Sequence, residues 1–220
     1  DKLFWTATKN TFQYLLYVGP ANIILGFLFA LLLNQKLHGR IVVRGLIFFP
    51  YVLMTTVVGV IWRWILDGGN MGVLNYYLGK LGIDTIYFLT DKSTAMLGVA
   101  IASIWWTVGY NTVIYLAALQ DVPRDIIEAA AIDGATAWEA FWKITLPHLR
   151  PIILLNAIYT IIEMGTAADD ATNGKIVGAI RDIARPYSYA AVLSWIYAFG
   201  LLLLILLAFL LLRPRKGSST

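Results

Sequence analysis

Long apolar stretches alternate with shorter polar connections along the chain. Five apolar stretches stand out, at about residues 12–33, 43–66, 95–119, 151–166 and 189–212. A bilayer core about 30 Å thick requires roughly 20 apolar residues per helical span, and only the fourth stretch is shorter than that. Pro20 and Pro50 fall inside spans, where proline is tolerated and often kinks the helix. The pattern therefore predicts an all-α, polytopic bundle of transmembrane helices.

The connections between these stretches differ in character. Residues 34–42 form a short basic loop, and residues 67–94 form a longer loop with a turn signal at 67–70. Residues 167–188 are polar. Residues 120–150 are amphipathic and do not resemble a loop. The chain shows no soluble domain and no short repeat, so we expect a single transmembrane domain over residues 1–220.

Composition supports a membrane environment. The chain is 59% hydrophobic and 14% charged, whereas soluble domains carry about 25% charged residues. It has no cysteine, which excludes disulfides and thiolate metal sites. The net charge of +4 comes from dispersed Lys and Arg, so no segment offers the basic face that nucleic-acid binding needs. Membrane lipid is an expected partner and nucleic acid is not.

The orientation of the chain should follow the distribution of Lys and Arg near the spans. The totals on the two sides are nearly equal and decide nothing. Basic residues are dense in the tail, however, at Arg213, Arg215 and Lys216, and the 34–42 loop has bases without acids. This density predicts a cytoplasmic location for the C-terminus and for residues 120–150.

The first half of the amphipathic segment predicts a short helix. Asp121 precedes Pro123, a favourable start for a first helical turn. Gly134 is placed to end the helix at the position that favours glycine. The apolar face is formed by Ile126, Ile127, Ala130 and Ala131.

The second half predicts another short helix. Thr136 and Glu139 have the spacing of a capping box. We expect Pro147 to stop this helix and Pro151 to start the next span. The apolar face is formed by Trp138, Phe141, Trp142 and Ile144. Residues 121–150 are thus predicted to form a helix–turn–helix elbow between two spans.

The surface of this elbow leaves two interpretations open. Small residues on its exposed side would let another backbone approach closely, namely Ala129, Ala130 and Gly134. Charged residues would make polar contacts at a rim, namely Arg124, Asp125, Glu128 and Asp133. The elbow therefore either docks on a partner protein or rests as an amphipathic helix on the bilayer.

The elbow resembles the cytoplasmic motif of the ABC-importer permeases. That motif reads Glu-Ala-Ala, three residues, Gly, nine residues, Ile, one residue, Leu-Pro. The spacing is intact here at Glu128, Ala129, Ala130, Gly134, Ile144, Leu146 and Pro147. Seven positions at fixed spacing between two spans make a specific signal. The run from Ala118 to Pro147 is similar to the carbohydrate-uptake branch, which includes maltose and glycerol-phosphate permeases.

The resemblance implies a function and a set of partners. In such permeases the elbow is a coupling helix that docks on a separate ATPase, here through the seven motif residues and Asp133. The implied complex has a second permease, two ATPase subunits and an extracytoplasmic solute-binding protein in a prokaryotic inner membrane. The cargo is expected to be a sugar, oligosaccharide or sugar derivative.

The chain departs from the family pattern in two places. The family core has six spans, and the sequence shows five, so the missing first span would precede Asp1. A Gly-Gly-rich outer segment is replaced by residues 165–187, which bears on the binding-protein contact and the substrate class.

The sequence contains no ATPase motif. A phosphate-binding loop needs G-x-x-x-x-G-K-[ST], and the Gly174-Lys175 pair lacks both the upstream glycine and the following hydroxyl. We therefore expect no catalytic residue, metal or cofactor in this chain, and ATP and Mg²⁺ in the partner ATPase.

Polar residues inside the spans suggest a translocation pathway. Ser103, Thr107, Tyr110 and Asn111 share one helix face in the third stretch, and Asn156, Thr160 and Glu163 share one in the fourth. Trp106 and Tyr159 lie beside them. Aromatic rings with amides and carboxylates suit sugars, which have apolar faces and polar edges. The alternative is interhelical hydrogen bonding, which we favour for Ser103 and Thr107. The pathway candidates are Trp106, Tyr110, Asn111, Tyr159, Thr160 and Glu163.

Other functions remain open at this stage. An ABC permease for a non-carbohydrate solute fits the same motif. An autonomous secondary transporter or channel would need repeats or broken helices, and the sequence shows neither. A membrane scaffold would leave the elbow motif unexplained.

Overall fold

The computed structural model describes residues 2–35, 38–69, 72–91, 94–166 and 187–212. Most of the 165–187 segment and the basic tail after Leu212 lie outside these ranges, as do the predictions made for them. Within them the chain forms helices and no strand, so the predicted all-α fold is confirmed. Four of these helical stretches are long and apolar enough to cross a membrane, or five if one bent pair counts as a single span.

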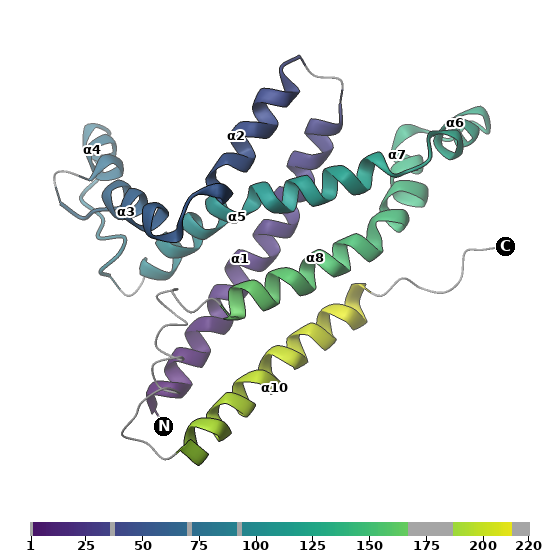
Figure 1. Cartoon of the computed structure of the whole chain (residues 1–220). Helices are drawn as coiled ribbons and strands as arrows, with labels where there is room; N and C mark the ends of the chain where they lie inside the picture. The colour runs from purple at the N-terminus through teal and green to yellow at the C-terminus, as the bar shows by residue number, and fades with distance from the viewer. Residues whose placement is uncertain (1, 36–37, 70–71, 92–93, 167–186, 213–220) are drawn as a thin grey trace.

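Three of the predicted spans are single helices, α1 (Lys2–Asn34), α5 (Ala95–Gln120) and α10 (Tyr187–Leu212). Among the described helices, α1 and α5 pack against each other most extensively. Helix α8 (Leu146–Thr166) packs against α1, α5 and α10 (Figure 1). Apart from Leu193, the side chains described on α10 are exposed or half-buried. An apolar helix with so much exposed surface requires lipid or another protein around it.

Two apolar clusters hold α1, α5 and α8 together. One contains Ala30, Tyr115 and Leu149, which are all 0% exposed. The other contains Tyr14, Val18 and Met164, and the Tyr14 hydroxyl donates to the Met164 sulfur at 3.4 Å. The first cluster lies next to the elbow and the second lies at the opposite end of α8. The three helices are therefore fixed to one another at both ends.

The second predicted span is not one helix. It is broken into α2 (Arg40–Val52) and α3 (Thr55–Ile65), which are bent by 101°. The kink expected near Pro50 is therefore a complete break of the helix, at which Leu53 and Met54 adopt extended backbone. Pro50 lacks an N–H group and weakens this turn. The Leu53 carbonyl accepts a hydrogen bond from Trp106 Nε1 at 3.2 Å, which satisfies a polar group that the break exposes.

The predicted loop after this span contains a further helix, α4 (Val73–Lys80). The turn signal is confirmed, since Asp67 Oδ2 accepts from the Gly69 N–H at 3.2 Å. Asn75 is 7% exposed, and its side chain connects the two ends of the segment from Asp67 to Ile86. Its Nδ2 donates to the carbonyls of Asp67 and Ile86 at 2.8 and 2.9 Å, and its Oδ1 accepts from the Ile86 N–H at 3.0 Å.

The second elbow helix does not stop at Pro147. The chain stays helical through α7 (Ala137–Ala140), a π-helical turn η1 (Phe141–Thr145) and α8, which passes through both prolines. The predicted stop at Pro147 and start at Pro151 are therefore wrong. Proline removes one i to i−4 hydrogen bond. A π turn directly before Pro147 changes the hydrogen-bond spacing there, so the helix continues instead of ending.

Candidate functional site

The elbow begins with α6 (Arg124–Ile132), which follows α5 after a three-residue turn. Pro123 occupies the N-cap position and no side chain caps this end, so Asp121 does not start the helix as predicted. Asp121 instead lies 4.0 Å from His148 Nε2 at the base of α8. Val122 is 6% exposed and anchors the turn.

Gly134 ends α6 in the way the sequence predicts. Its φ is +86°, a left-handed conformation that side chains with a Cβ rarely adopt. The Gly134 N–H donates to the Ala131 carbonyl at 3.1 Å, and the Ala135 N–H donates to the Ala130 carbonyl at 2.9 Å. These two bonds form a Schellman motif, which satisfies the last carbonyls of the helix. The corner between the two elbow helices is thus fixed by backbone bonds.

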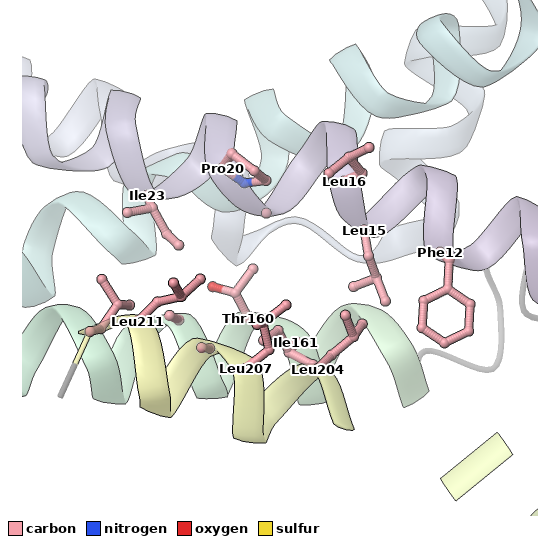
Figure 2. A pocket seen from close by; sticks show the side chains of 14 residues that line it. Phe12, Leu15, Leu16, Pro20, Ile23, Thr160, Ile161, Leu204, Leu207 and Leu211 are labelled. Carbon is pink, nitrogen blue, oxygen red and sulfur yellow. The ribbon is translucent and has the colours of Figure 1, made fainter. Parts of the chain in front are cut away.

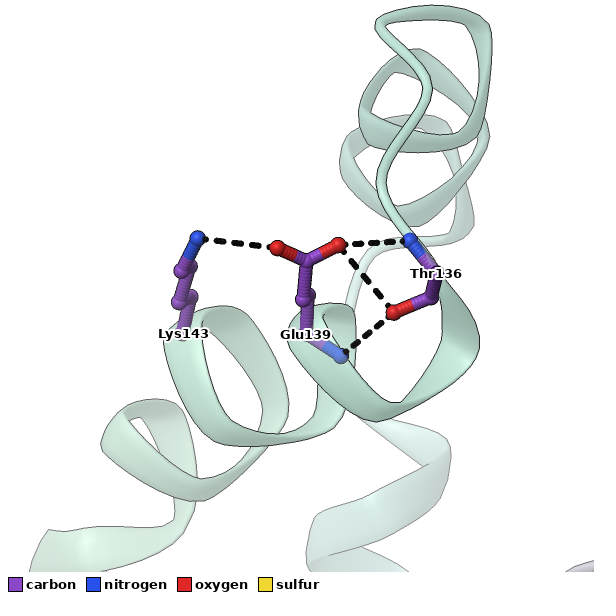
Figure 3. Close-up of polar contacts among 3 residues, drawn as sticks. All are labelled: Thr136, Glu139 and Lys143. Atoms are coloured by element: carbon purple, nitrogen blue, oxygen red, sulfur yellow. Dashed lines mark hydrogen bonds and ion pairs between the residues drawn. The ribbon is translucent and has the colours of Figure 1, made fainter.

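The predicted capping box at Thr136 is confirmed (Figure 3). Glu139 Oε2 accepts from the Thr136 N–H at 3.0 Å and from its hydroxyl at 3.1 Å. Thr136 Oγ1 accepts from the Glu139 N–H at 3.3 Å. Lys143 Nζ adds an exposed ion pair with Glu139 Oε1 at 3.4 Å. The second helix of the elbow therefore starts at a defined residue and leads directly into α8.

The motif residues divide into two groups. Glu128, Ala129, Asp133 and Gly134 are exposed on or just after α6, where no residue is buried. Ala130 is half-buried, as are Ile144, Leu146 and Pro147 at the base of α8. Ile126 is 49% and Ile132 87% exposed. The elbow therefore presents an unpartnered helix at its tip and is held at its base by the bundle (Figure 1).

Polar side chains predicted on α5 and α8 meet between helices. Asn22 Nδ2 on α1 donates to Thr107 Oγ1 at 2.8 Å, which confirms the interhelical hydrogen bond expected of Thr107. Thr160 Oγ1 donates to Asn111 Oδ1 at 3.5 Å, and these two residues are only 2% and 3% exposed. Ser103 instead donates to the Val99 carbonyl within α5 at 2.9 Å, so it does not join two helices.

Three tyrosines from different helices form an aromatic cluster next to the broken span. Tyr110 lies between Tyr51 and Tyr159, with ring centroids 4.9 Å from each. The hydroxyls of Tyr51 and Tyr159 are 3.4 Å apart. Tyr51 was not among the predicted site residues, because on sequence it belonged to a span interior with no polar stripe. Tyr51 directly follows Pro50, a residue that weakens helices, and this is the only signal in the sequence that could have marked it.

Trp106 and Glu163 flank this tyrosine cluster. Trp106 lies one helical turn from Tyr110 and bonds to the break in the second span. Glu163 lies one helical turn from Tyr159 on α8. Trp106, Tyr110, Tyr159 and Glu163 are all half-buried. The structure thus brings four of the six predicted pathway residues to one partly accessible region, and it buries Asn111 and Thr160 against each other.

An apolar cavity of about 380 Å³ lies between α1, α8 and α10 (Figure 2). Thr160 stands among otherwise apolar side chains there, which include Leu15, Ile23, Ile161 and Leu207. This lining does not suit a hydrophilic solute. Among the described residues no group of His, Asp and Glu is arranged to hold a metal ion.

Comparison with known sequences agrees with the resemblance that the elbow motif indicated. Residues 22–213 match the family described as binding-protein-dependent transport system inner membrane component. The chain is 34% identical over 160 residues to the trehalose/maltose transport system permease protein of Thermococcus litoralis, covering 73% of this chain and 54% of that protein. It is 32% identical over 180 residues to the sn-glycerol-3-phosphate transport system permease protein of Escherichia coli O6:K15:H31, covering 80% and 59%. The chain thus spans little more than half the length of these relatives.

Comparison with solved structures supports the fold. A chain of a bacterial alginate ABC transporter, crystallised with an alginate pentasaccharide-bound periplasmic protein, aligns with a TM-score of 0.81. The alignment covers 97% of this chain and 79% of that one at 23% identity. At this identity the similarity establishes the arrangement of the helices.

Proposed function

This chain belongs to the family of binding-protein-dependent transport system inner membrane components, and we propose that it forms half of the translocation pathway of an ABC importer for a sugar, oligosaccharide or sugar derivative. The observation that carries the proposal is the elbow, in which an exposed helix is rigidly joined to two membrane helices. Three features make the joint rigid, namely the Schellman motif at Gly134, the capping box at Thr136 and the unbroken helix from Ala137 into α8.

The elbow has the mechanical properties that coupling requires. A lever transmits motion only if its own joints do not bend. Docking of α6 in a cleft on an ATPase subunit would cover Glu128, Ala129 and Ala130, and the half-buried Ile144, Leu146 and Pro147 would pass the motion to α8. ATP and Mg²⁺ belong to two ATPase subunits, and no residue of this chain binds them. A second permease and an extracytoplasmic solute-binding protein complete the proposed complex.

The proposed solute contacts are the aromatic residues beside the broken span. Tyr110, Tyr159 and Trp106 offer flat faces to sugar C–H groups, and Glu163 offers a hydrogen-bond acceptor to hydroxyls. Ionisable residues inside membrane helices are costly and usually serve function. Asn111 and Thr160 stay in the proposal as residues that reach the solute only when α5 and α8 separate. Broken spans line cavities at membrane depth, which supports this location.

The carbohydrate assignment is supported by the relatives. Their names include trehalose, maltose and sn-glycerol 3-phosphate. The broken span is also a feature that an autonomous secondary transporter would show, but such a protein has no use for an exposed rigid elbow. The elbow and the C-terminus are assigned to the cytoplasm, because an ATPase must reach α6.

The test is site-specific photocrosslinking in the membrane of the native host. A photoreactive residue replaces Ala129 on α6, and in a control it replaces Tyr77 on α4, which is 60% exposed at the opposite end of α5. We expect the Ala129 probe alone to crosslink an ATPase subunit. Crosslinks from position 129 to lipid only would instead identify the elbow as a membrane-surface helix and reject the coupling role.

A further inference from the structure

A basic cavity of about 250 Å³ lies where α1, α2 and α5 meet, at the end of the bundle that carries the elbow. Its walls are formed by Leu33, Arg40, Ile41, Arg44, Leu116 and Gln120. Leu33 is in the last turn of α1, Arg40 begins α2, and Gln120 is the last residue of α5. Because three apolar helices end there, the cavity lies at the depth where the hydrocarbon core gives way to headgroups.

The cavity has positive charge without an internal counter-charge. Arg40 and Arg44 are one helical turn apart, so both guanidinium groups lie on the same face of α2. Neither forms an ion pair with any described residue. The nearest acid in sequence to Gln120 is Asp121, which is not part of the cavity wall and whose carboxylate lies 4.0 Å from His148 Nε2 on α8. Two like charges at this spacing destabilise a helix, and a bound anion would offset that cost.

The lining also selects among anions. Half of it is apolar, contributed by Leu33, Ile41 and Leu116. A free inorganic anion gains nothing from apolar walls, whereas a phospholipid presents a phosphate directly beside glycerol and acyl carbons. Arginine matches the phosphate oxygens with two parallel N–H donors, and Gln120 can donate to a further oxygen. Ile41 and Val42 are 81% and 65% exposed beside the arginines, as expected for a surface covered by acyl chains.

We propose that this cavity binds the phosphate of an anionic phospholipid, with Arg40 and Arg44 as the charged ligands and Gln120 as a polar one. The site is separate from the tyrosine cluster and from α6. Its position next to the root of the elbow means that the bound lipid would contact the start of α2 and the end of α5. Basic pockets between membrane helices at this depth are suited to such headgroups.

Bound lipid measured on the purified chain tests the proposal. The chain is reconstituted in nanodiscs of equal parts phosphatidylcholine and phosphatidylglycerol, released in mild detergent and examined by native mass spectrometry. We expect phosphatidylglycerol to be retained over phosphatidylcholine. Each of R40Q and R44Q should weaken its retention about fivefold, and the double variant about twentyfold or more. R63Q, at the end of α3 and outside the cavity, is the matched control and should retain lipid normally.

Further measurements distinguish a lipid phosphate from a free phosphate, and loss of lipid binding from loss of fold. Inorganic phosphate and glycerol phosphate are offered without anionic lipid, and arginine-dependent binding of these alone would overturn the lipid assignment. Thermal midpoints of R40Q and R44Q in phosphatidylcholine discs should equal that of the unchanged protein or lie slightly above it, because both arginines are exposed and their mutual repulsion is removed. Phosphatidylglycerol retention that survives R40Q/R44Q would reject the site. Loss of a co-purifying ATPase in R40Q/R44Q with unchanged lipid retention would assign the arginines to a protein contact instead.

Discussion

Gly134 shows how a single residue can determine the shape of the elbow. Its φ of +86° turns the chain between α6 and α7, and a Cβ there would meet no atom within 4 Å. The requirement for glycine is therefore one of backbone conformation and not of space. A left-handed conformation costs an L residue about 1–2 kcal/mol, which the chain avoids by leaving the Cβ out.

The first prediction follows from this residue. We expect Gly134→Asp to abolish co-purification with the ATPase, because it adds a negative charge next to Asp133 at the exposed corner. Gly134→Asn has nearly the same size as Gly134→Asp and the same tolerance of the left-handed region, but it adds no charge, so it should keep most of the association. Gly45→Ala on α2, where a Cβ also meets nothing, is the control. Normal ATPase recovery with Gly134→Asp would show that the corner is not part of the docking surface.

Asn75 holds together the segment between Asp67 and Ile86, which contains α4. Its side chain makes three hydrogen bonds to backbone groups of Asp67 and Ile86. Removing a buried partner leaves such groups unsatisfied at a cost of about 1–3 kcal/mol each. We expect Asn75→Ala to lower the thermal midpoint in detergent by several degrees, with Asn34→Ala, an exposed residue, as the control. An unchanged midpoint would mean that this loop adds nothing to stability.

At the scale of elements, α2 approaches α5 closely at Gly109. A Cβ on Gly109 would overlap the carbonyl of Ile47 and lie 2.9 Å from the Phe48 Cα. This contact places Tyr51 against Tyr110 and the broken end of α2 against Trp106. The bend between α2 and α3 is therefore fixed to α5 by the close approach at Gly109, two aromatic contacts and one indole hydrogen bond. The aromatic contacts are Tyr51 with Tyr110 and Trp62 with Trp105.

This packing yields a prediction for the element pair. Gly109→Ala must push α2 away from α5, and overpacking of this kind costs about 1–3 kcal/mol. We expect a lower thermal midpoint and slower uptake in the same variant. Gly59→Ala on α3 is the matched control, because its Cβ meets nothing and alanine favours a helix. Equal midpoints for Gly109→Ala and Gly59→Ala would indicate that α2 and α5 are not in close contact in the protein.

The elements also show what the sequence could and could not predict. Apolar length alone identified α1, α5 and α10, and local spacing identified the Gly134 corner and the Thr136 capping box. Pro50 marked a kink in the second span, but the complete break at Leu53 could not be predicted. Apolar composition is continuous across it, and the Leu53 carbonyl is satisfied by Trp106, which is distant in sequence. The helix through Pro147 was missed because a π turn compensates the proline, and no residue pattern reports that compensation.

For the whole molecule, the arrangement of the tyrosine cluster depends on three helices at once. Tyr51, Tyr110 and Tyr159 come from α2, α5 and α8, so a relative movement of any two helices changes the cluster. The elbow connects α5 to α8 directly. Motion of α6 by an ATPase would therefore alter the spacing of Tyr110 and Tyr159, and this links the two proposed sites. Periodicity placed Tyr110 on a polar face and Tyr159 beside one, but only the assembled helices brought them together with Tyr51.

This link gives a prediction for uptake. We expect Tyr159→Ala and Glu163→Gln each to raise the solute concentration at half-maximal uptake about fivefold to tenfold, as loss of a hydrogen bond or ring contact to a polar solute would. Asn111→Ala should act mainly on the maximal rate, because it is buried against Thr160. Tyr77→Ala on the exposed α4 is the control. Unchanged affinity in both Tyr159→Ala and Glu163→Gln would remove these residues from the pathway.

The central claim is that this chain works only as part of an ATP-driven complex. The most direct measurement is a mild-detergent pull-down of the chain from its native membrane, with mass spectrometry of the proteins that accompany it. The account predicts recovery of an ATPase subunit, a second permease and a solute-binding protein whose ligand is a carbohydrate. Recovery of the chain alone, or only with copies of itself, would contradict the account and point to an autonomous transporter.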